Sequence, residues 1–255
     1  MKIFSIILSF LLLIGCENKD NKVKGSDSEK TINVAVSSDY PPFVYGESGK
    51  LVGFEVELIN AIAMKLQKVV KLHDIDFHGI IKAVAKKQVD CAIAAIGKTE
   101  ERNKEVDFTM PYHRSMTVIV TSIGSGINSI KDLIGKSIGF ETGTTYEKYF
   151  EDNAEKLFNG VNKLQRFKFS DLLEAMRQGK CQAILTGYSE GYELQNSNPD
   201  LKIIPIPETA ISLAIALPKG SDLLQPINNV LEDMIKNGEI VKLEAQYFKK
   251  IVAED

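Results

Sequence analysis

The sequence predicts an α/β protein of two lobes, each built on a mostly parallel sheet. One observation is that strand-like and helix-like segments alternate along the chain from Thr31 onward. Another is that the same order of segments occurs twice, once in each half. The third is length, because 255 residues can form two lobes that each bury their own core. Strands that alternate with helices are typical of parallel sheets.

Composition excludes several classes of function. The chain is 44% hydrophobic and 25% charged, as is usual for a globular protein. Its formal net charge of −3 is too close to neutral to indicate a nucleic-acid partner. The histidines His73, His78 and His113 have no metal-like spacing. We therefore expect no nucleic acid, no metal and no cofactor.

The first sixteen residues have the pattern of a signal peptide. Lys2 is followed by an apolar segment over 3–14, which is shorter than the roughly 20 residues of a membrane-spanning helix. The ending Leu13-Ile14-Gly15-Cys16 resembles a bacterial lipobox, so we expect Cys16 to be lipidated. Residues 17–30 are polar and are expected to form a flexible tether. Plain secretion, with Cys16 discarded or left as a free thiol, is the alternative.

The first half opens with a strand, because Ile32, Val34 and Val36 alternate with polar residues. Asp39-Tyr40-Pro41-Pro42 ends this strand. Apolar residues at every fourth position from Phe54 to Leu66 predict an amphipathic helix. A strand over 69–75, a helix over 79–87 and a strand over 89–96 are expected next.

The second half repeats this order. It reads as a strand over 137–140, a helix over 143–153, a strand over 164–167, a helix over 171–178 and a strand over 181–185. Residues 79–84 align with 171–176, and residues 89–93 align with 181–185. The matching order of elements, more than the low identity, indicates two related lobes.

Two lobes of this kind would form one cleft, since ligands bind beyond the carboxyl ends of the strands in parallel sheets. Segments 115–121 and 211–217 are expected to be strands that cross between the lobes. The first lobe is then 31–116 with 214–255, and the second is 117–213. Cys91 and Cys181 fall in corresponding strands of different lobes, so we expect buried thiols rather than a disulfide.

Several short runs carry a resemblance to a known family. They are Tyr40-Pro41-Pro42-Phe43, Leu51-Val52-Gly53-Phe54-Glu55-Val56-Glu57-Leu58, Thr99-Glu100-Glu101-Arg102, Val106-Asp107-Phe108-Thr109-Met110-Pro111-Tyr112, and Gly143-Thr144-Thr145. In this order and spacing, across nearly all of 31–248, the chain resembles the polar amino-acid-binding proteins of ABC importers, family 3 of the extracytoplasmic solute-binding proteins. Each run is weak alone, but the ordered set is specific.

The resemblance implies a periplasmic-binding-protein-like fold of type II, in which two lobes close around a small amino-acid-like ligand by a hinge motion. It also implies an ABC transporter permease as partner, and a location in the periplasm or at the extracytoplasmic membrane surface. With the lipid anchor at Cys16, we expect a membrane-attached monomer.

Arg102 is the first candidate for contact with the ligand. A planar guanidinium binds a carboxylate through two parallel hydrogen bonds, which a lysine cannot do. In the family, the arginine at this position holds the α-carboxylate of the ligand. The alternative is a surface ion pair with Glu100, Glu101 or Glu105.

Thr144 and Thr145 stand at the predicted start of a helix, where backbone N–H groups favour an anion. The family uses this pair for the same carboxylate. The alternative is simple N-capping, and both roles can hold at once.

The resemblance places further residues around the ligand. Tyr40 and Phe77 match the aromatic walls of the family site, whereas Phe43 is expected in the core. Asp39 and Glu141 match positions near the ligand side chain, where an acidic pair would suit a basic ligand. The alternative is that both are solvated loop carboxylates. Ala95 is also expected at the site.

Two positions depart from the family pattern. Gly97 stands where the family has Ser or Thr, and Gly187 stands where it has the aspartate that pairs with the α-ammonium. A buried ammonium without a counter-charge is costly. Either Glu190 or Glu141 replaces that aspartate, or the ligand has no α-amino group. We also expect Gly187→Asp to strengthen the binding of α-amino acids.

The function expected is therefore capture of a small carboxylate-bearing solute, with a polar or basic amino acid favoured. The main alternative is an enzyme on the same scaffold, similar to the cyclohexadienyl dehydratases, with Glu141 and Glu190 as acid or base. No Ser/His/Asp or Cys/His set supports an enzyme. A third possibility is a binding lobe of a sensor or an adhesin.

Overall fold

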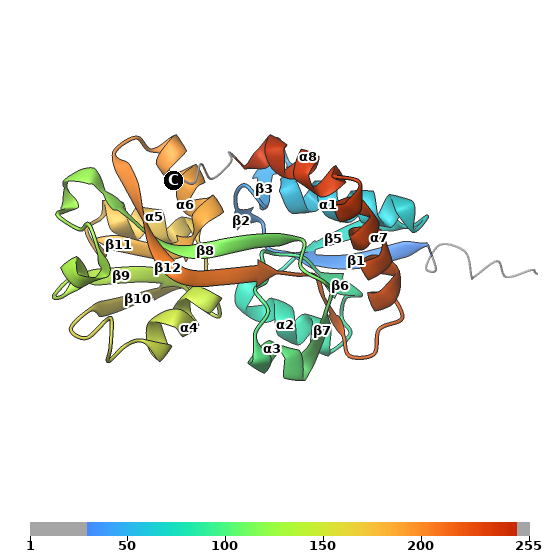
Figure 1. The fold of residues 1–255 in the computed structure, drawn as a ribbon, viewed down its shortest axis with the longest axis horizontal. Coiled ribbons are helices and arrows are strands. Elements are labelled where there is room, and N and C mark those ends of the chain that lie inside the picture. Colours follow the sequence, from blue (N-terminus) through green and yellow to red (C-terminus); the bar gives the residue numbers. More distant parts are fainter. Residues whose placement is uncertain (1–29, 249–255) are drawn as a thin grey trace, which may run out of the picture.

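The computed structural model describes residues 30–248, which form two lobes with a five-stranded sheet in each (Figure 1). The first-lobe sheet has the order β5-β1-β6-β13-β7, with strands β1 (Thr31–Val36), β5 (Val69–Asp74), β6 (Cys91–Ala92), β7 (Val106–Phe108) and β13 (Ala216–Pro218). The second-lobe sheet has the order β10-β9-β11-β8-β12, with strands β8 (His113–Ser122), β9 (Ser137–Glu141), β10 (Asn162–Arg166), β11 (Ala183–Gly187) and β12 (Leu201–Leu213). The predicted two-lobed α/β fold is confirmed.

Helices cover both sheets. Those that pack in the first lobe are α1 (Phe54–Lys65), α2 (Phe77–Ala85), α3 (Glu100–Glu105), α7 (Leu224–Lys236) and α8 (Glu239–Tyr247). Those of the second lobe are α4 (Thr145–Asp152), α5 (Ser170–Arg177) and α6 (Tyr188–Ser197). The chain also forms a small sheet of β2 (Asp39–Tyr40), β3 (Val44–Glu47) and β4 (Lys50–Val52), and the short 3-10 turns η1 (Ile123–Ser125) and η2 (Ile130–Leu133).

Each sheet is mixed, not mostly parallel as the sequence predicted. In the first lobe β1 runs parallel to β5 and β6, whereas β13 runs antiparallel to β6 and β7. In the second lobe β9 runs parallel to β10 and β11, whereas β8 runs antiparallel to β11 and β12. The reversed strands adjoin the points where the chain passes between the lobes. A chain that leaves one lobe and later returns must run in opposite directions on its two passages.

Two long strands, β8 and β12, pass between the lobes side by side (Figure 1). They pair antiparallel from Leu213 opposite His113 to Leu201 opposite Ser122. The strand expected over 211–217 is in fact two strands, since β12 ends at Leu213 and β13 starts at Ala216. The proposed lobe boundaries lie within β8 and at the end of β12.

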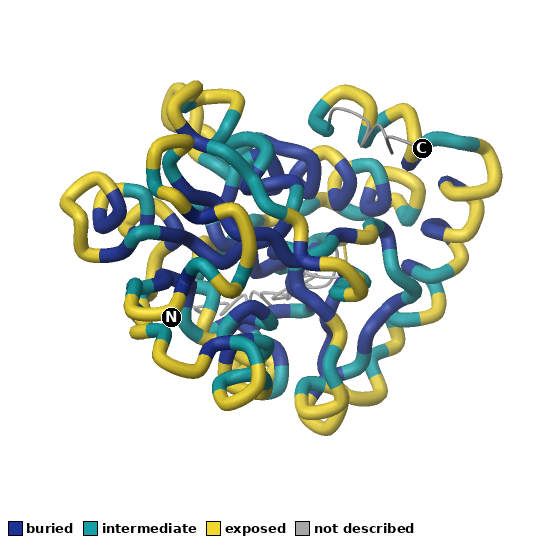
Figure 2. The backbone as a smooth tube through the Cα atoms, turned by 60° about the vertical axis from the view of Figure 1, so that its left-hand side comes forward, coloured by how far each residue is buried: buried dark blue, intermediate teal, exposed yellow. Residues whose placement is uncertain are grey.

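The cores follow the predicted periodicity. Phe54, Leu58 and Ile62 on α1 are completely buried, as their four-residue spacing predicts. Ile80 on α2 and Leu172 on α5, which the internal alignment equates, are also buried. Figure 2 shows that buried backbone lies mainly in the interior of the molecule, with exposed turns around it. The repeat therefore places equivalent helix faces against the two sheets.

The third strand of each lobe differs from the prediction. In the first lobe β6 covers only Cys91–Ala92, and the chain then turns through Ala95 before α3 and β7 of the same lobe. Ala95 adopts a left-handed conformation with φ of 47°, which cannot continue a strand. In the second lobe β11 covers Ala183–Gly187, two residues later than expected. The apolar runs predicted correctly which residues are buried, but they did not predict which residues pair by hydrogen bonds in the sheet.

Both cysteines of the described chain are free and buried, as predicted. Burial raises the pKa of Cys91 to about 12 and that of Cys181 to about 11, so both stay protonated at neutral pH. Cys181 precedes β11 instead of lying within a strand.

The predicted signal peptide, the lipidation of Cys16 and the tether up to residue 29 lie outside the described residues. A search for membrane-spanning helices within 30–248 finds none with sufficient length and apolar character.

Candidate functional site

The predicted site residues lie where strands of the two lobes end and face each other. Asp39 and Tyr40 follow β1, and Gly97 follows β6, on the side of the first lobe. Glu141 ends β9 and Gly187 ends β11, on the side of the second lobe. The sequence predicted one cleft between the lobes here, and in the structure residues of the two sides are in direct contact. We call this contact region the inter-lobe site, and its residues are described in turn below.

Arg102 reaches from the first lobe to the second. Its Nη1 donates to the carbonyl oxygen of Gly97 at 2.6 Å, and its Nη2 donates to the carbonyl oxygen of Gly143 at 2.8 Å. The guanidinium also lies over the ring of Phe77, 5.5 Å from the ring centre. No ion pair found within residues 30–248 includes Arg102, so the alternative of a surface salt bridge does not describe it.

Burial lowers the pKa of Arg102 to about 10, because a charged group loses solvation energy when it leaves water. The guanidinium nevertheless stays charged at neutral pH. Two of its five N–H groups are used by the carbonyls, so the others remain to bind an anion.

The helix α4 starts directly opposite Arg102. The Thr144 hydroxyl donates to the carbonyl of Glu141 at 2.7 Å and accepts from the amide of Glu147 at 3.2 Å. Thr144 is thus the N-cap of α4, and its hydroxyl hydrogen is already donated. Its contribution to an anion would come from the backbone at the helix start, where first-turn N–H groups lack helical partners.

Thr145 and Gly97 touch across the two lobes. A Cβ atom built on Gly97 would lie 2.8 Å from Cγ2 of Thr145 and 2.9 Å from Cγ2 of Ile211. Real Cβ atoms essentially never come so close to other atoms. The absence of a side chain at position 97 therefore leaves room for the methyl group of Thr145. Gly97, one of the two departures from the family pattern, is thus matched by Thr145 of the opposite lobe.

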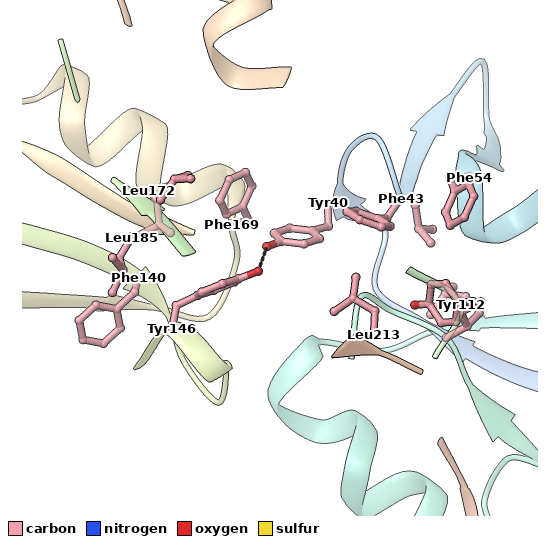
Figure 3. Packing of buried hydrophobic residues seen from close by; sticks show 14 of the residues in the cluster. Tyr40, Phe43, Phe54, Tyr112, Phe140, Tyr146, Phe169, Leu172, Leu185 and Leu213 are labelled. Carbon is pink, nitrogen blue, oxygen red and sulfur yellow. Dashed lines mark hydrogen bonds between the residues drawn. The ribbon is translucent and has the colours of Figure 1, made fainter. Parts of the chain in front are cut away.

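Aromatic residues of both lobes meet at the centre of the site (Figure 3). The Tyr40 hydroxyl lies 3.5 Å from that of Tyr146 and 3.2 Å from Oγ1 of Thr186. The Tyr40 ring packs edge-on against Phe169, with 4.9 Å between ring centres. It also stacks on Phe43, which is fully buried in the core as predicted.

Acidic side chains gather beside these rings. Glu141 is 5% exposed, and Glu190 is 1% exposed. Burial raises the pKa of Glu141 to about 9, and the nearby carboxylates of Asp39, Glu190 and Asp76 add to the effect. Burial also raises the pKa of Glu190 to about 8. The alternative that Glu141 is a solvated loop carboxylate does not fit this burial.

Asp39 is half-buried at the edge of the site. Its Oδ2 lies 3.4 Å from both the amide and the hydroxyl of Ser170, at the start of α5 in the second lobe. A carboxylate at a helix N-terminus is favoured by the helix dipole. Asp39 therefore forms a contact between the lobes in addition to its place near Glu141.

Gly187 is the N-cap of α6, with φ of −80° and ψ of 161°. Any residue can adopt this conformation, so backbone strain does not explain the glycine. A Cβ atom there would lie 2.5 Å from the Tyr146 hydroxyl and would collide with Oε2 of Glu190. The expectation that Gly187→Asp strengthens binding stays a prediction, but an aspartate there would have to displace the Glu190 carboxylate and the Tyr146 hydroxyl. The position is already filled by the carboxylate of Glu190.

Ala95, which the resemblance places at the site, uses its backbone for a contact within the first lobe. Its amide donates to Oε1 of Glu55 at 2.7 Å, and the same oxygen accepts a hydrogen bond from the Tyr112 hydroxyl. Glu55 is completely buried in the first turn of α1. The carboxylate of Glu55 thus fixes the turn that leads from β6 to Gly97.

Sequence reasoning missed three residues of the site. Tyr146 comes directly after the predicted Thr145 on α4, and Asp76 directly precedes Phe77. Phe169 could have been found from the internal repeat, because the alignment of 79–84 with 171–176 places it opposite Phe77. Within the described residues, no group of three or more His, Cys, Asp or Glu side chains could hold a metal ion.

Comparison with protein families and relatives agrees with this architecture. The profile of the family described as "Bacterial extracellular solute-binding proteins, family 3" matches residues 32–250. The arginine-binding extracellular protein ArtP of Bacillus subtilis is 35% identical over 230 residues, which cover 88% of this chain and 89% of ArtP. The L-cystine-binding protein TcyJ of Escherichia coli is 30% identical over 233 residues, which cover 89% of this chain and 85% of TcyJ.

Solved structures show the same fold. An ancestral arginine-binding protein bound to arginine aligns with a TM-score of 0.81 and 35% identity, covering 86% of this chain and 99% of the other. The substrate-binding protein AbpA of Streptococcus pneumoniae, bound to L-arginine, aligns with a TM-score of 0.79 and 26% identity, covering 88% and 98%. From its residues, its fold and these matches, the chain belongs to family 3 of the bacterial extracellular solute-binding proteins.

Proposed function

We propose that this protein binds an α-amino acid with a cationic side chain, arginine foremost, and passes it to an amino-acid ABC transporter. The observation that carries the proposal is the charge balance of the inter-lobe site. The buried carboxylates Glu141 and Glu190 face this region together with the guanidinium of Arg102. A ligand with one carboxylate and two cationic groups would complement all three charges.

The ligand carboxylate is assigned to Arg102 and the start of α4. The guanidinium keeps free N–H donors beside Gly143, and α4 directs its first amides to the same place. A carboxylate between them would replace the Gly143 carbonyl as an acceptor and would join the two lobes.

The cationic side chain of the ligand is assigned to Glu141. This carboxylate is buried near Asp39 and Asp76, both of which raise its pKa through their negative charge. A guanidinium or ammonium beside these groups would relieve their mutual repulsion. The arginine-binding relatives and solved structures support this assignment.

Binding is proposed to occur by closure of the lobes about β8 and β12. Contacts across the inter-lobe site join Arg102 to Gly143, Tyr40 to Thr186, and Lys148 to Glu101 at 3.2 Å. A ligand that touches both lobes stabilises the closed form by the difference in its affinity for the two forms. The exposed Lys148–Glu101 pair contributes little, as surface ion pairs generally do.

The proposal excludes turnover of the ligand. Raised carboxyl pKa values at Glu141 and Glu190 could serve acid–base chemistry, but the named relatives are arginine- and cystine-binding proteins. Incubation with prephenate and with arogenate, followed by ultraviolet detection of aromatic products, should show no product above the rate without protein. Formation of either product would support the dehydratase alternative.

We also propose that the mature chain is a monomer anchored in the membrane through lipid on Cys16, with residues 17–30 as tether. Replacement of Cys16 by alanine should then release the protein from membranes into the soluble extracytoplasmic fraction. If this variant stayed attached to membranes, the lipid anchor on Cys16 would be contradicted, whereas the proposal for the ligand site would be unaffected.

The direct test of the ligand is a thermal-shift screen of the purified chain with arginine, lysine, histidine, glutamine and cystine. A ligand at one hundred times its Kd stabilises the folded state by about 2.7 kcal/mol. In a protein of this size, that energy raises Tm by roughly 5–10 °C. We expect the largest shift with arginine. A larger shift with glutamine or cystine would contradict the proposed charge complementarity.

A further inference from the structure

Glu190 is a buried carboxylate with an incomplete set of partners. It lies in the first turn of α6 and is 1% exposed to solvent. Hydrogen bonds from its own backbone amide and from the Tyr40 side chain lower its pKa, but its Oε2 atom has no hydrogen-bond partner in the described chain. Buried polar atoms nearly always have partners, and a buried unpaired charge is especially costly. Such a group needs a proton or a cation.

The protein itself supplies no cation to Glu190. No ion pair found within residues 30–248 includes it. The titratable groups that interact with its charge are the hydroxyls of Tyr40, Tyr112 and Tyr146 and the carboxyls of Glu55 and Glu141. These groups are neutral or negative at neutral pH, so a positive charge beside Oε2 would have to come from the ligand.

The space above Gly187 is shaped for this carboxylate. A Cβ atom on Gly187 would lie 3.2 Å from Cδ of Glu190 and would overlap its Oε2 atom. The carboxylate of Glu190 therefore occupies the volume that a side chain at position 187 would otherwise fill. Since the backbone conformation of Gly187 suits any residue, the glycine is explained by this volume alone.

Glu190 also lies close to the place assigned to the ligand carboxylate. Tyr146 follows Thr145 on α4, and a Cβ atom on Gly187 would lie 2.5 Å from its hydroxyl. The negative charge of Glu190 raises the pKa of Tyr146, whereas the positive charge of Arg102 lowers it. This hydroxyl therefore interacts with both charges. An α-carboxylate and an α-ammonium share one carbon atom, so their binding groups must be neighbours of this kind.

We infer that Glu190 is the counter-ion for the α-ammonium of the ligand, and that Gly187 and Glu190 act as a pair in which the glycine makes room for the glutamate. This inference rests on the proposed function. It assigns Glu141 to the ligand side chain and Glu190 to the α-ammonium. It also requires a ligand that carries an α-amino group, which excludes keto acids and other solutes without one.

The test compares L-arginine with 5-guanidinopentanoic acid, which has the same carboxylate and guanidinium but no α-amino group. Both are titrated calorimetrically into the wild-type protein and into Glu190→Gln, which keeps the shape of the side chain and removes its charge. We expect arginine affinity to fall on the order of 100-fold, because one partner of a buried charge pair is lost. Affinity for the analogue should stay within about threefold.

Glu193→Gln is the matched control, because Glu193 lies on the same helix and its carboxylate accepts a hydrogen bond from the Ser197 hydroxyl on the exposed side. This control should bind both compounds as the wild type does. Folding of every variant is checked by its ligand-free Tm, and Glu190→Gln should not be less stable than the wild type, since it replaces a buried carboxyl whose Oε2 lacks a partner with a neutral amide of the same shape.

A second variant moves the carboxylate to position 187. Glu190→Ala should bind arginine weakly, and Gly187→Asp combined with Glu190→Ala should recover at least tenfold of that loss. Gly187→Asp alone should weaken binding, because two carboxylates then compete for one volume. Recovery in the double variant requires a counter-charge role and does not follow from a structural role of Glu190.

The outcomes separate the inference from the proposed function. If the wild type binds arginine but Glu190→Gln weakens arginine and the analogue equally, the inference is overturned and the proposed function stands. If the wild type binds neither arginine nor any other cationic amino acid, the proposed function fails and the inference fails with it. Selective loss of arginine binding, with recovery in the double variant, supports both.

Discussion

The starts of α4 and α6 face the same inter-lobe site but are built differently. The helix α4 begins with Thr144, whose hydroxyl caps an amide of the first turn. The helix α6 begins with Gly187, has no side-chain cap, and carries the buried Glu190 in its first turn. Both helix starts direct positive partial charge toward the site.

This difference shows how two similar helix starts can select opposite charges. At α4 the neutral threonine leaves the dipole uncompensated, and Arg102 adds a full positive charge opposite it, so the region favours an anion. At α6 the negative charge of the ionised Glu190 carboxylate is larger than the positive partial charge at the helix start, so the region favours a cation. An α-amino acid presents these two charges on adjacent atoms. The predictions below challenge this comparison, in order of decreasing effect.

The largest effect is expected from Arg102→Ala, which removes the full charge at the α4 side. Arginine binding should weaken about 1000-fold, because the ligand carboxylate would be buried without a cation. Arg102→Lys should recover part of the affinity but lose the paired geometry of the guanidinium. Titration calorimetry measures both, with Lys104→Ala on the same helix as control. An Arg102→Ala variant with wild-type affinity would remove Arg102 from the site.

The next largest effect concerns the side chain of the ligand. Glu141→Gln should weaken arginine binding on the order of 100-fold, since the guanidinium loses a buried counter-charge. Binding of the uncharged amino acid glutamine should stay the same or improve in this variant. A competition assay with both amino acids gives the change in preference directly. If the variant bound arginine and glutamine more weakly by the same factor, Glu141 would support the fold and would not select the charge of the ligand side chain.

A smaller effect is expected from pH. The raised pKa values of Glu141, about 9, and Glu190, about 8, mean that the ligand-free folded state binds more protons than the unfolded chain at neutral pH. Their contribution to stability is fully present below pH 4.5, near the ordinary carboxyl pKa, and is lost as pH rises through 8 to 9. The ligand-free Tm should therefore fall over this range.

A cationic ligand reverses this trend, because it favours the ionised carboxylates. Arginine binding at neutral pH should release protons, and its affinity should rise with pH up to about pH 9. Calorimetry in buffers of different ionisation enthalpy measures the number released. Glu55, with a raised pKa of about 7, contributes to the ligand-free trend, so Glu141→Gln combined with Glu190→Gln is the necessary control. Proton uptake on binding would contradict the proposed charges.

The smallest effect separates the two threonines of α4. Thr144→Ala should lower the free energy of unfolding by about 1 kcal/mol, because the helix loses its N-cap. This change corresponds to a fall in Tm of roughly 2–4 °C. Thr145→Ala should change Tm less, since Thr145 is not the cap, and should change arginine affinity more. If Thr145→Ala lowered Tm more than Thr144→Ala, the stabilising role of Thr144 as the N-cap of α4 would be contradicted.

Much of the fold could be predicted from local sequence pattern. The alternation of Ile32, Val34 and Val36, and the four-residue spacing from Phe54 to Ile62, reflect burial on one face and survive in the structure. The internal repeat placed Ile80 and Leu172 correctly in equivalent helices. The extent of β6 could not be predicted, because the left-handed turn at Ala95 depends on a hydrogen bond to Glu55, which lies far away in the sequence.

Arg102, Thr145 and Glu141 could be proposed for the site from the resemblance to the family. Which carboxylate takes the place of an aspartate at position 187 could not be decided from the sequence. That choice depends on the direction of the Glu190 side chain over Gly187, and on the Tyr146 hydroxyl beside it. Both are properties of the packed lobes, where residues from different helices meet.

The most direct test of the account is a crystal structure of the protein with L-arginine. The account predicts that the α-carboxylate lies within about 3 Å of Arg102 and of the first amides of α4, and that the α-ammonium lies within about 3 Å of Oε2 of Glu190. An arginine bound in the reverse direction, with its guanidinium at Glu190 and its carboxylate away from Arg102, would contradict it.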